Sequence, residues 1–328
     1  MLFISAASAL IGKGEGMAQQ GGHGFLRLEA KIPLGNVRGR LDHLAVDLKR
    51  GRLFVAELGN NSVGVVDLTN RKLVRTISGL REPQGLAYLP RTDTLYVANG
   101  GDGSVRLFRG TDYASIGRID LGEDADNIRV DTAGNRIYVG YGGGAVAVID
   151  PSNNRRVGVV RLKAHPEGFQ LATKTKQVFV NLPDAQTIAV IDRGALNHLA
   201  QWPTHRLNAN FPMALDEERR HVLVGFRRPA ELGVFSMADG SLVVTMEICG
   251  DADDIFVDPK RQRVYVSCGE GFVDVFDARD IAYRRIARIR TISGARTSLF
   301  VPALNLLLLA ARASSGQQAA IWVFRPGR

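Results

Sequence analysis

The stretch Leu95-Tyr96-Val97-Ala98-Asn99 decides the fold, because its apolar triplet at positions 95–97 recurs along the chain. Six similar triplets lie at Leu53-Phe54-Val55, Ile137-Tyr138-Val139, Val178-Phe179-Val180, Val222-Leu223-Val224, Val264-Tyr265-Val266 and Leu307-Leu308-Leu309. Their central residues are 41 to 44 positions apart. A further apolar segment closed by aspartate follows most triplets, and another aspartate often precedes them, so each unit is predicted to contain four short strands.

Seven such units predict an all-β fold, a seven-bladed β-propeller with four antiparallel strands per blade, because stacking around a ring buries both faces of every sheet. The last unit supplies only three strands. The segment 26–34 (LRLEAKIPL) is similar to the fourth strands elsewhere. We therefore expect this N-terminal strand to close the seventh blade and remove the open edges. Residues 25–328 then form a single domain.

Composition places the chain among ordinary globular proteins, with 328 residues, 45% hydrophobic and 23% charged. Disordered, collagenous and disulfide-scaffold proteins are excluded. The apolar run Leu2–Ile11 is too short to span a bilayer, so residues 1–24 are interpreted as an export signal or a disordered tail. An export signal implies a periplasmic or secreted protein; a tail leaves it in the cytoplasm. Cys249 and Cys268 would form a disulfide after export and stay free thiols in the cytosol.

The Tyr-Val-Ala-Asn step at positions 96–99 also carries a family resemblance. Leu53-Phe54-Val55-Ala56 and Val264-Tyr265-Val266-Ser267 match that step in part. The pattern resembles the YVTN-type bacterial seven-bladed β-propeller repeat family over residues 25–326. The resemblance implies the fold but no single activity, because that family contains both binding proteins and enzymes on similar rings.

Position in the repeat assigns residues to one of the two faces of the ring. The turns after the first and third strands of each blade share one face, which holds the recurring aspartates, interpreted as turn-forming residues. Basic clusters such as Lys49-Arg50-Gly51-Arg52 and Lys260-Arg261 fall in the same turns. They are either solvated turn residues or a docking surface for an anionic partner. Nucleic acid is the least favoured partner, because these turns lack interleaved aromatic residues.

Repetition breaks on the opposite face, at the entrance to the innermost strand of each blade. Twelve positions before the triplet centres, and beside them, lie the candidate ligand-binding residues Asp42, His43, Gln84, Asp126, Asn127, His165, Glu167, Phe211, Asp253, Asp254 and Arg296. A propeller brings these positions together at the mouth of its central channel. Polar residues gathered where the fold does not require them predict a ligand site. A hydrated rim that binds nothing is the alternative interpretation.

We expect a binding protein that takes a small polar or cationic ligand, a metal ion or a protein segment at this acidic mouth. The carboxylates of Asp42, Asp126, Glu167 and Asp253 suit Ca²⁺, Mg²⁺ or Mn²⁺ as the metal. The alternative is a metal-dependent hydrolase, lactonase or lyase, in which His43 or His165 moves the proton. No Gly-Xaa-Ser-Xaa-Gly elbow or phosphate-binding loop is present in the sequence.

Overall fold

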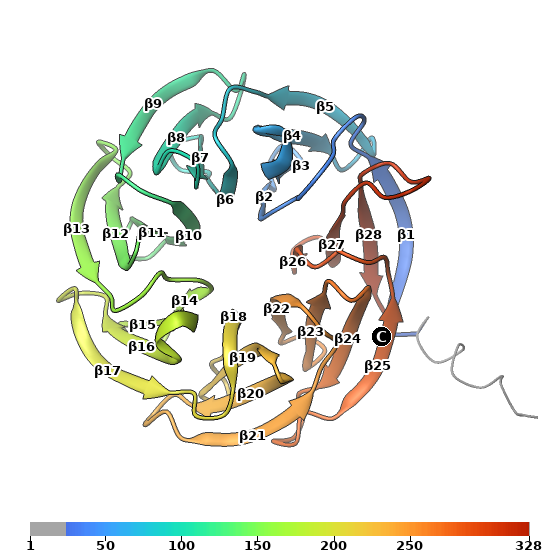
Figure 1. Ribbon diagram of the computed structural model, residues 1–328. Coiled ribbons are helices and arrows are strands. Elements are labelled where there is room, and N and C mark those ends of the chain that lie inside the picture. Colours follow the sequence, from blue (N-terminus) through green and yellow to red (C-terminus); the bar gives the residue numbers. More distant parts are fainter. Residues whose placement is uncertain (1–23, 328) are drawn as a thin grey trace, which may run out of the picture.

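The computed structural model describes residues 24–327, and their strands form seven antiparallel sheets around one axis (Figure 1). This confirms the predicted seven-bladed β-propeller. The predicted signal or tail lies outside the described residues except for Gly24. No helix within residues 24–327 is long and apolar enough to cross a membrane.

The strands follow one another blade by blade. The first three blades contain β2 (Leu44–Asp47), β3 (Arg52–Glu57), β4 (Ser62–Asp67) and β5 (Lys72–Ile77); β6 (Pro83–Leu89), β7 (Thr94–Asn99), β8 (Ser104–Arg109) and β9 (Ser115–Asp120); and β10 (Ala125–Asp131), β11 (Arg136–Tyr141), β12 (Ala145–Asp150) and β13 (Arg155–Arg161). The fourth and fifth contain β14 (Phe169–Leu171), β15 (Gln177–Leu182), β16 (Thr187–Asp192) and β17 (Asn197–Pro203); and β18 (Asn208–Asp216), β19 (His221–Arg228), β20 (Ala230–Ser236) and β21 (Leu242–Glu247). The sixth contains β22 (Ala252–Asp258), β23 (Arg263–Cys268), β24 (Phe272–Asp277) and β25 (Arg285–Arg290), and the seventh β26 (Ser298–Val301), β27 (Leu306–Ala311), β28 (Ala320–Pro326) and β1 (Leu26–Pro33). Two single-turn 3-10 helices, η1 (Leu58–Asn60) and η2 (Pro183–Ala185), follow β3 and β15.

The apolar triplets form the second strand of each blade, where both sides of the sheet are covered. Tyr96 and Tyr265, two triplet centres, have no exposed surface. Tyr96 packs with Ile128 and Val139 of the next blade in one apolar cluster. Because neighbouring blades cover both faces of each sheet, these strands are continuous apolar runs and do not alternate between apolar and polar residues.

The ring closes through the N-terminal strand, as the sequence predicts. β1 pairs antiparallel with β28, from Leu26 opposite Pro326 to Pro33 opposite Ala320. The blue and red ends of the chain therefore lie side by side in one sheet (Figure 1). An ion pair of 2.6 Å between Arg325 Nε and Glu29 Oε1 ties the two strands together.

The recurring aspartates have the structural role expected of them. Asp47 Oδ1 accepts a hydrogen bond of 3.0 Å from the Lys49 N–H, and its Oδ2 lies 2.8 Å from Arg50 Nη1. The same turn recurs at Asp258, which pairs with Arg261 at 3.0 Å. Arginines in the basic clusters of this face are thus partly neutralised by the aspartates beside them, and the turns hold the ends of the strands.

Candidate functional site at the channel mouth

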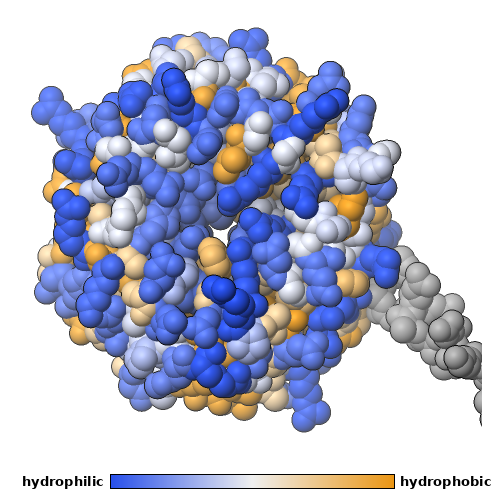
Figure 2. Space-filling model, in the orientation of Figure 1, coloured by the Kyte–Doolittle hydropathy of each residue, from blue (hydrophilic) through white to orange (hydrophobic). Residues whose placement is uncertain are grey.

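A cavity of about 360 Å³ lies on the axis of the ring and is lined by residues of all seven blades. The space-filling view down the same axis shows hydrophilic residues around the central opening (Figure 2). Eight of the predicted site residues line this cavity, namely Asp42, His43, Asp126, Asn127, Glu167, Phe211, Asp253 and Asp254. The structure therefore brings together residues that are far apart in the sequence.

β-Bulges at the start of several innermost strands place these residues at the mouth. In β10, Asp126 and Asn127 both lie opposite Gly140, because the register shifts between Ala125 and Ile128. The pairs Gln84-Gly85 of β6 and Phe211-Pro212 of β18 occupy the same kind of bulge. A bulge leaves an extra residue outside the regular ladder and redirects its side chain. A backbone feature repeated around the ring thus presents side chains that do not repeat.

The blades of β2 and β14 have the same hydrogen-bond pattern at the mouth, although these two strands begin just after it. The Asp42 N–H donates to Ala56 O at 2.8 Å, and the Ala56 N–H donates to His43 O at 3.1 Å. In the same way the Glu167 N–H donates to Asn181 O at 3.1 Å, and the Asn181 N–H donates to Gly168 O at 3.0 Å. In both blades two residues at the mouth therefore face one residue of the second strand.

The remaining three predicted residues lie beside the cavity and contact its lining or its rim. Arg296 Nε is 3.2 Å from Asp253 Oδ2, and His165 Nε2 is 3.8 Å from Asp126 Oδ2. Gln84 donates a hydrogen bond of 3.1 Å to Asp124 Oδ1, and Asp124 Oδ2 lies 3.7 Å from His165 Nδ1. All eleven predicted residues therefore belong to one connected region.

The mouth contains more positive charge than the sequence analysis assigned to it. Besides Arg296, two further arginines reach the mouth: Arg40 Nη2 lies 2.8 Å from Asp42 Oδ2, and Arg227 forms ion pairs with Asp253 and Asp251. Comparing one position per repeat missed these arginines, which reach the mouth from neighbouring positions on long side chains. The rim is a network of paired charges in which carboxylates outnumber arginines.

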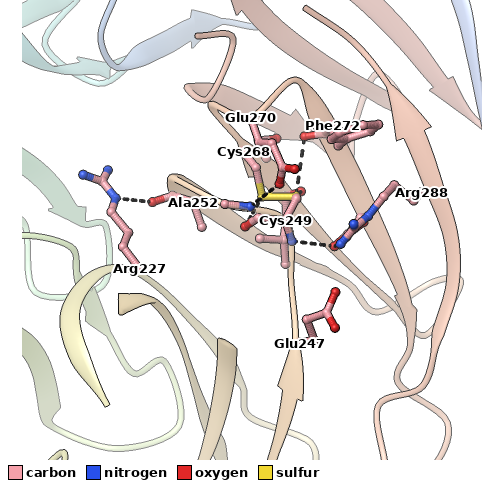
Figure 3. The surroundings of a disulfide bond; sticks show 12 residues. Arg227, Glu247, Cys249, Ala252, Cys268, Glu270, Phe272 and Arg288 are labelled. Carbon is pink, nitrogen blue, oxygen red and sulfur yellow. Dashed lines mark hydrogen bonds and ion pairs between the residues drawn. A yellow bond between two sulfur atoms is a disulfide. The ribbon is translucent and has the colours of Figure 1, made fainter. Parts of the chain in front are cut away.

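Arg227 is held in place from two sides. Its guanidinium carbon lies 3.8 Å from the centroid of the Phe211 ring, a cation–π geometry, and its Nε donates to Ala252 O at 3.0 Å. Figure 3 shows this bond reaching from β19 to the start of β22. The aromatic ring predicted at the mouth therefore positions a cation as well as lining the cavity.

Burial and mutual repulsion leave several carboxyl groups poorly ionised. Burial, followed by the nearby charge of Asp126, raises the pKa of Glu167 to about 7. Burial raises the pKa of Asp254 to about 7 and that of Asp42 to about 6. Such shifts cluster at functional sites, where groups are held against their preference for water.

The His165–Asp126 pair behaves in the opposite way. Although burial disfavours the charged imidazole, its ion pair with Asp126 and its contact with Gly142 O raise the pKa of His165 to about 9. Burial likewise opposes ionisation of Asp126, but His165 and His43 hold the pKa of that carboxyl below its usual value. His165 is thus a protonated partner of Asp126 near neutral pH.

The predicted metal set is not assembled. In the part of the chain that the structure describes, no group of three or more histidine, cysteine, aspartate or glutamate side chains is arranged to hold a metal ion. The reason lies in the pairing of the charges, because Asp42 faces Arg40, Asp253 faces Arg227 and Arg296, and Asp126 faces His165. Three of the four carboxylates expected to bind Ca²⁺, Mg²⁺ or Mn²⁺, those of Asp42, Asp126 and Asp253, thus already face a cationic side chain, and the metal site stays a prediction.

A disulfide bond fixes the loop that carries part of this network. Cys249 and Cys268 are joined, which settles a point that the sequence left open. The Cys249 N–H also donates to Asp274 Oδ2 at 2.9 Å, and the Gly250 N–H donates to Glu270 Oε2 at 2.7 Å (Figure 3). The segment leading to Asp251 and Asp253 is thereby anchored to the end of β23.

Comparisons with known proteins identify the fold and no more. No family model matches the chain, and no curated protein matches its sequence. Among solved structures, Kuenenia stuttgartiensis hydrazine synthase is similar, with a TM-score of 0.76 and 18% identity over 93% of this chain and 98% of that one. A chain of the mitotic checkpoint complex has a TM-score of 0.78 and 12% identity, covering 100% of this chain and 99% of its own. Likeness at such low identity is a likeness of shape.

Proposed function

We propose that this propeller binds a small organic cation, a primary ammonium group above all, at the channel mouth without chemical turnover. The observation that carries the proposal is Glu167. Its side chain lines the cavity, and within residues 24–327 it has no ion pair, whereas Asp42, Asp126 and Asp253 each face an arginine or histidine. An entering cation would supply the missing partner.

Asn127 supports the same ligand chemistry. The residue is buried in the lining, and its Oδ1 has no hydrogen-bond partner among the described residues. A primary ammonium carries three N–H donors, so after bonding to the Glu167 carboxylate it has donors left for a second acceptor, and we assign that part to this amide oxygen. The apolar side chains of Phe211 and Met213 line the same cavity and would contact the carbon chain of the ligand.

Titration calorimetry with n-butylamine and n-hexylamine tests the proposal. The variant Glu167→Gln should bind both amines about tenfold or more weakly, the loss expected for a charge-assisted hydrogen bond. Glu123→Gln is the matched control, because Glu123 is an exposed carboxylate in the loop before β10 and does not line the cavity. Amine binding that is absent, or equal in Glu167→Gln and the native protein, overturns the proposal.

A lysine side chain of a protein segment presents the same ammonium group. Nα-acetyl-lysine amide is therefore a third probe in the same titration. Binding of this compound with an affinity close to that of n-butylamine would favour a peptide partner. Much weaker binding would favour a free small molecule as the occupant.

An enzyme is the second candidate, and one observation favours it. The pKa of about 7 at Glu167 is the value that suits a general acid or base near neutral pH, and the group lies in a cavity. Incubation with a panel of lactones, followed by NMR of the products, tests this candidate. Turnover that Glu167→Gln abolishes would support catalysis, and unchanged substrates would count against it.

We also propose that the protein is exported and that it is related to the YVTN-type repeat family. The Cys249–Cys268 disulfide supports export, because such bonds persist in oxidising compartments and are rare in the cytosol. Expression with and without residues 1–24, followed by thiol titration of periplasmic and cytoplasmic fractions, tests the location. An intact disulfide only in the periplasmic fraction of the full chain is the expected result.

A further inference from the structure

A second set of equivalent residues follows the carboxylates along the innermost strands, and five of its seven members line the cavity. In every blade one residue of the innermost strand pairs with the triplet centre. These seven residues are Ala45, Ala87, Arg129, Gln170, Ala214, Phe256 and Leu299. Arg129 is the one charged member of a ring that is otherwise made of alanines, large apolar residues and one glutamine. The fold does not require a cation at this position, because the other six blades have an uncharged residue there.

Arg129 has few partners for its charge. Its Nη1 donates to Ile128 O at 2.9 Å, and its guanidinium carbon lies 5.4 Å from the centroid of the Phe169 ring. Within residues 24–327 it forms no ion pair, although it lines the cavity. A guanidinium carries five N–H donors, so most of them are left for a ligand or water. Burial lowers the pKa of Arg129 although the nearby charges of Asp254 and Asp126 act in the opposite direction, and a bound anion would offset the remaining cost of removing the charge from water.

The geometry gives the cavity two charged ends. Asp126 lies at the mouth, at the same repeat position as Glu167 in the next blade, and Arg129 lies three residues further along β10. A strand rises about 3.3 Å per residue and the bulge shortens the path, so the two backbone positions lie roughly 7 to 10 Å apart. A short flexible chain with one charge at each end spans such a distance. Apolar residues of the lining, including Ile128 and Met213, lie along the wall between the ends.

We propose that the natural ligand is a zwitterion, an ω-amino acid or a molecule with the same two ends, whose carboxylate is bound by Arg129. This inference rests on the proposed function, in which the ammonium group is bound at Glu167. Arg129 binds the carboxylate through two parallel N–H bonds, the geometry that a guanidinium offers to a carboxylate. The carboxylates of the mouth select against simple anions, because a ligand without an ammonium group would meet repulsion first.

Ligands of equal length that carry one or both charged groups test the two ends of the cavity separately. Calorimetry would compare 4-aminobutanoate with n-butylamine and butanoate, and 6-aminohexanoate with n-hexylamine and hexanoate. The native protein should bind one of the amino acids about tenfold tighter than its matched amine. In Arg129→Gln that advantage should vanish, while the amine binds as well as before or better, because a nearby positive charge has been removed.

Two further variants complete the experiment. Arg129→Lys keeps a point charge without the paired donors, so an intermediate loss is expected, and it replaces Arg129→Gln if thermal unfolding shows that variant to be misfolded. Arg81→Gln removes an exposed arginine from the loop before β6 and should leave all six affinities unchanged.

The outcomes distinguish the two proposals. If the amines bind and neither amino acid binds more tightly than its matched amine, the zwitterion proposal is overturned and the proposed function stands. Alkanoates that bind through Arg129 while amines do not would overturn the proposed function and the zwitterion together. Amino acids that bind equally to the native protein and Arg129→Gln overturn the role of Arg129. Binding by none of the six compounds overturns both proposals.

Discussion

The guanidinium of Arg227 lies 3.8 Å from the centre of the Phe211 ring, so an arginine at the end of one blade's second strand is stacked on an aromatic residue of the innermost strand of the same blade. The same arginine forms an ion pair with Asp253 in the next blade. Phe211 thus supports a link between two blades, and its removal should affect more than the shape of the cavity.

Replacing Phe211 with leucine should lower the free energy of unfolding by about 1 to 2 kcal/mol, since a partly buried cation–π contact and some apolar area are lost. Urea unfolding of the native protein and Phe211→Leu measures the difference. Phe211→Tyr is the matched control, because it keeps the ring, and it should unfold like the native protein. Equal stability of the leucine and tyrosine variants would show that Arg227 does not depend on the ring.

The affinity for n-butylamine should rise with pH between about pH 6 and pH 8, because the Glu167 carboxyl, with a pKa of about 7, loses its proton while the amine keeps its own. Calorimetry across this range measures the effect. Glu167→Gln should flatten most of the rise, leaving the smaller part due to Asp254. A binding constant independent of pH in the native protein would contradict the assignment of Glu167 as the ligand's partner.

Stability should change with pH in the opposite direction. The pKa of Asp254 is 3.8 for an exposed carboxyl and about 7 in the folded protein, so the folded state holds a proton that the unfolded state has released. Stability from this group is therefore complete below about pH 4 and is lost as the pH rises towards 7, by an amount on the order of a few kcal/mol.

Asp254→Asn tests this sign in denaturant unfolding at pH 4.5, 5.5, 6.5 and 7.5. Asparagine stays neutral and can still accept the bond of 2.7 Å that the Ser298 N–H donates to Asp254 Oδ2. The native protein should become less stable across the series relative to the variant. A native protein whose stability rises with pH as steeply as that of the variant would show that Asp254 ionises normally.

Reduction of the Cys249–Cys268 bond should lower the free energy of unfolding by about 3 kcal/mol, the value that chain entropy gives for a loop of this size. The two cysteines are 19 residues apart in sequence. Urea unfolding with and without dithiothreitol measures the loss. The double variant Cys249→Ser, Cys268→Ser should be insensitive to the reductant. A native protein that the reductant leaves unchanged would show that the bond adds no stability.

The ring itself could be predicted from the sequence because it depends on repetition. The triplets mark the second strands, and the segment before the first triplet unit has the pattern of an outer strand without a partner in its own blade. Its pairing with β28 follows from the need to cover an open edge. The grouping of Asp42, Glu167 and Asp253 was predictable for the same reason, since each position follows from the geometry of the repeat.

The electrostatics of the site were less predictable, because they depend on where long side chains end. Arg227 lies at the end of β19, which runs to Arg228 and so extends beyond the other second strands. No single repeat position marks it. Arg129 could have been found by aligning the residues opposite the triplet centres, where it stands against Ala45 and Ala87. The ion pairs at the predicted metal-binding carboxylates were missed because the carboxylates were counted without the cations beside them.

The pairing of β1 with β28 joins residues that are 296 positions apart, as in the Glu29–Arg325 ion pair. During synthesis β1 therefore remains without its partner until β28 is made, almost three hundred residues later. Six blades can assemble from neighbouring segments, but the final one requires contacts of the longest range in the chain, and such contacts form slowly. Until the circle is complete, the unpaired edge of β28 is therefore open to pairing with the wrong strand.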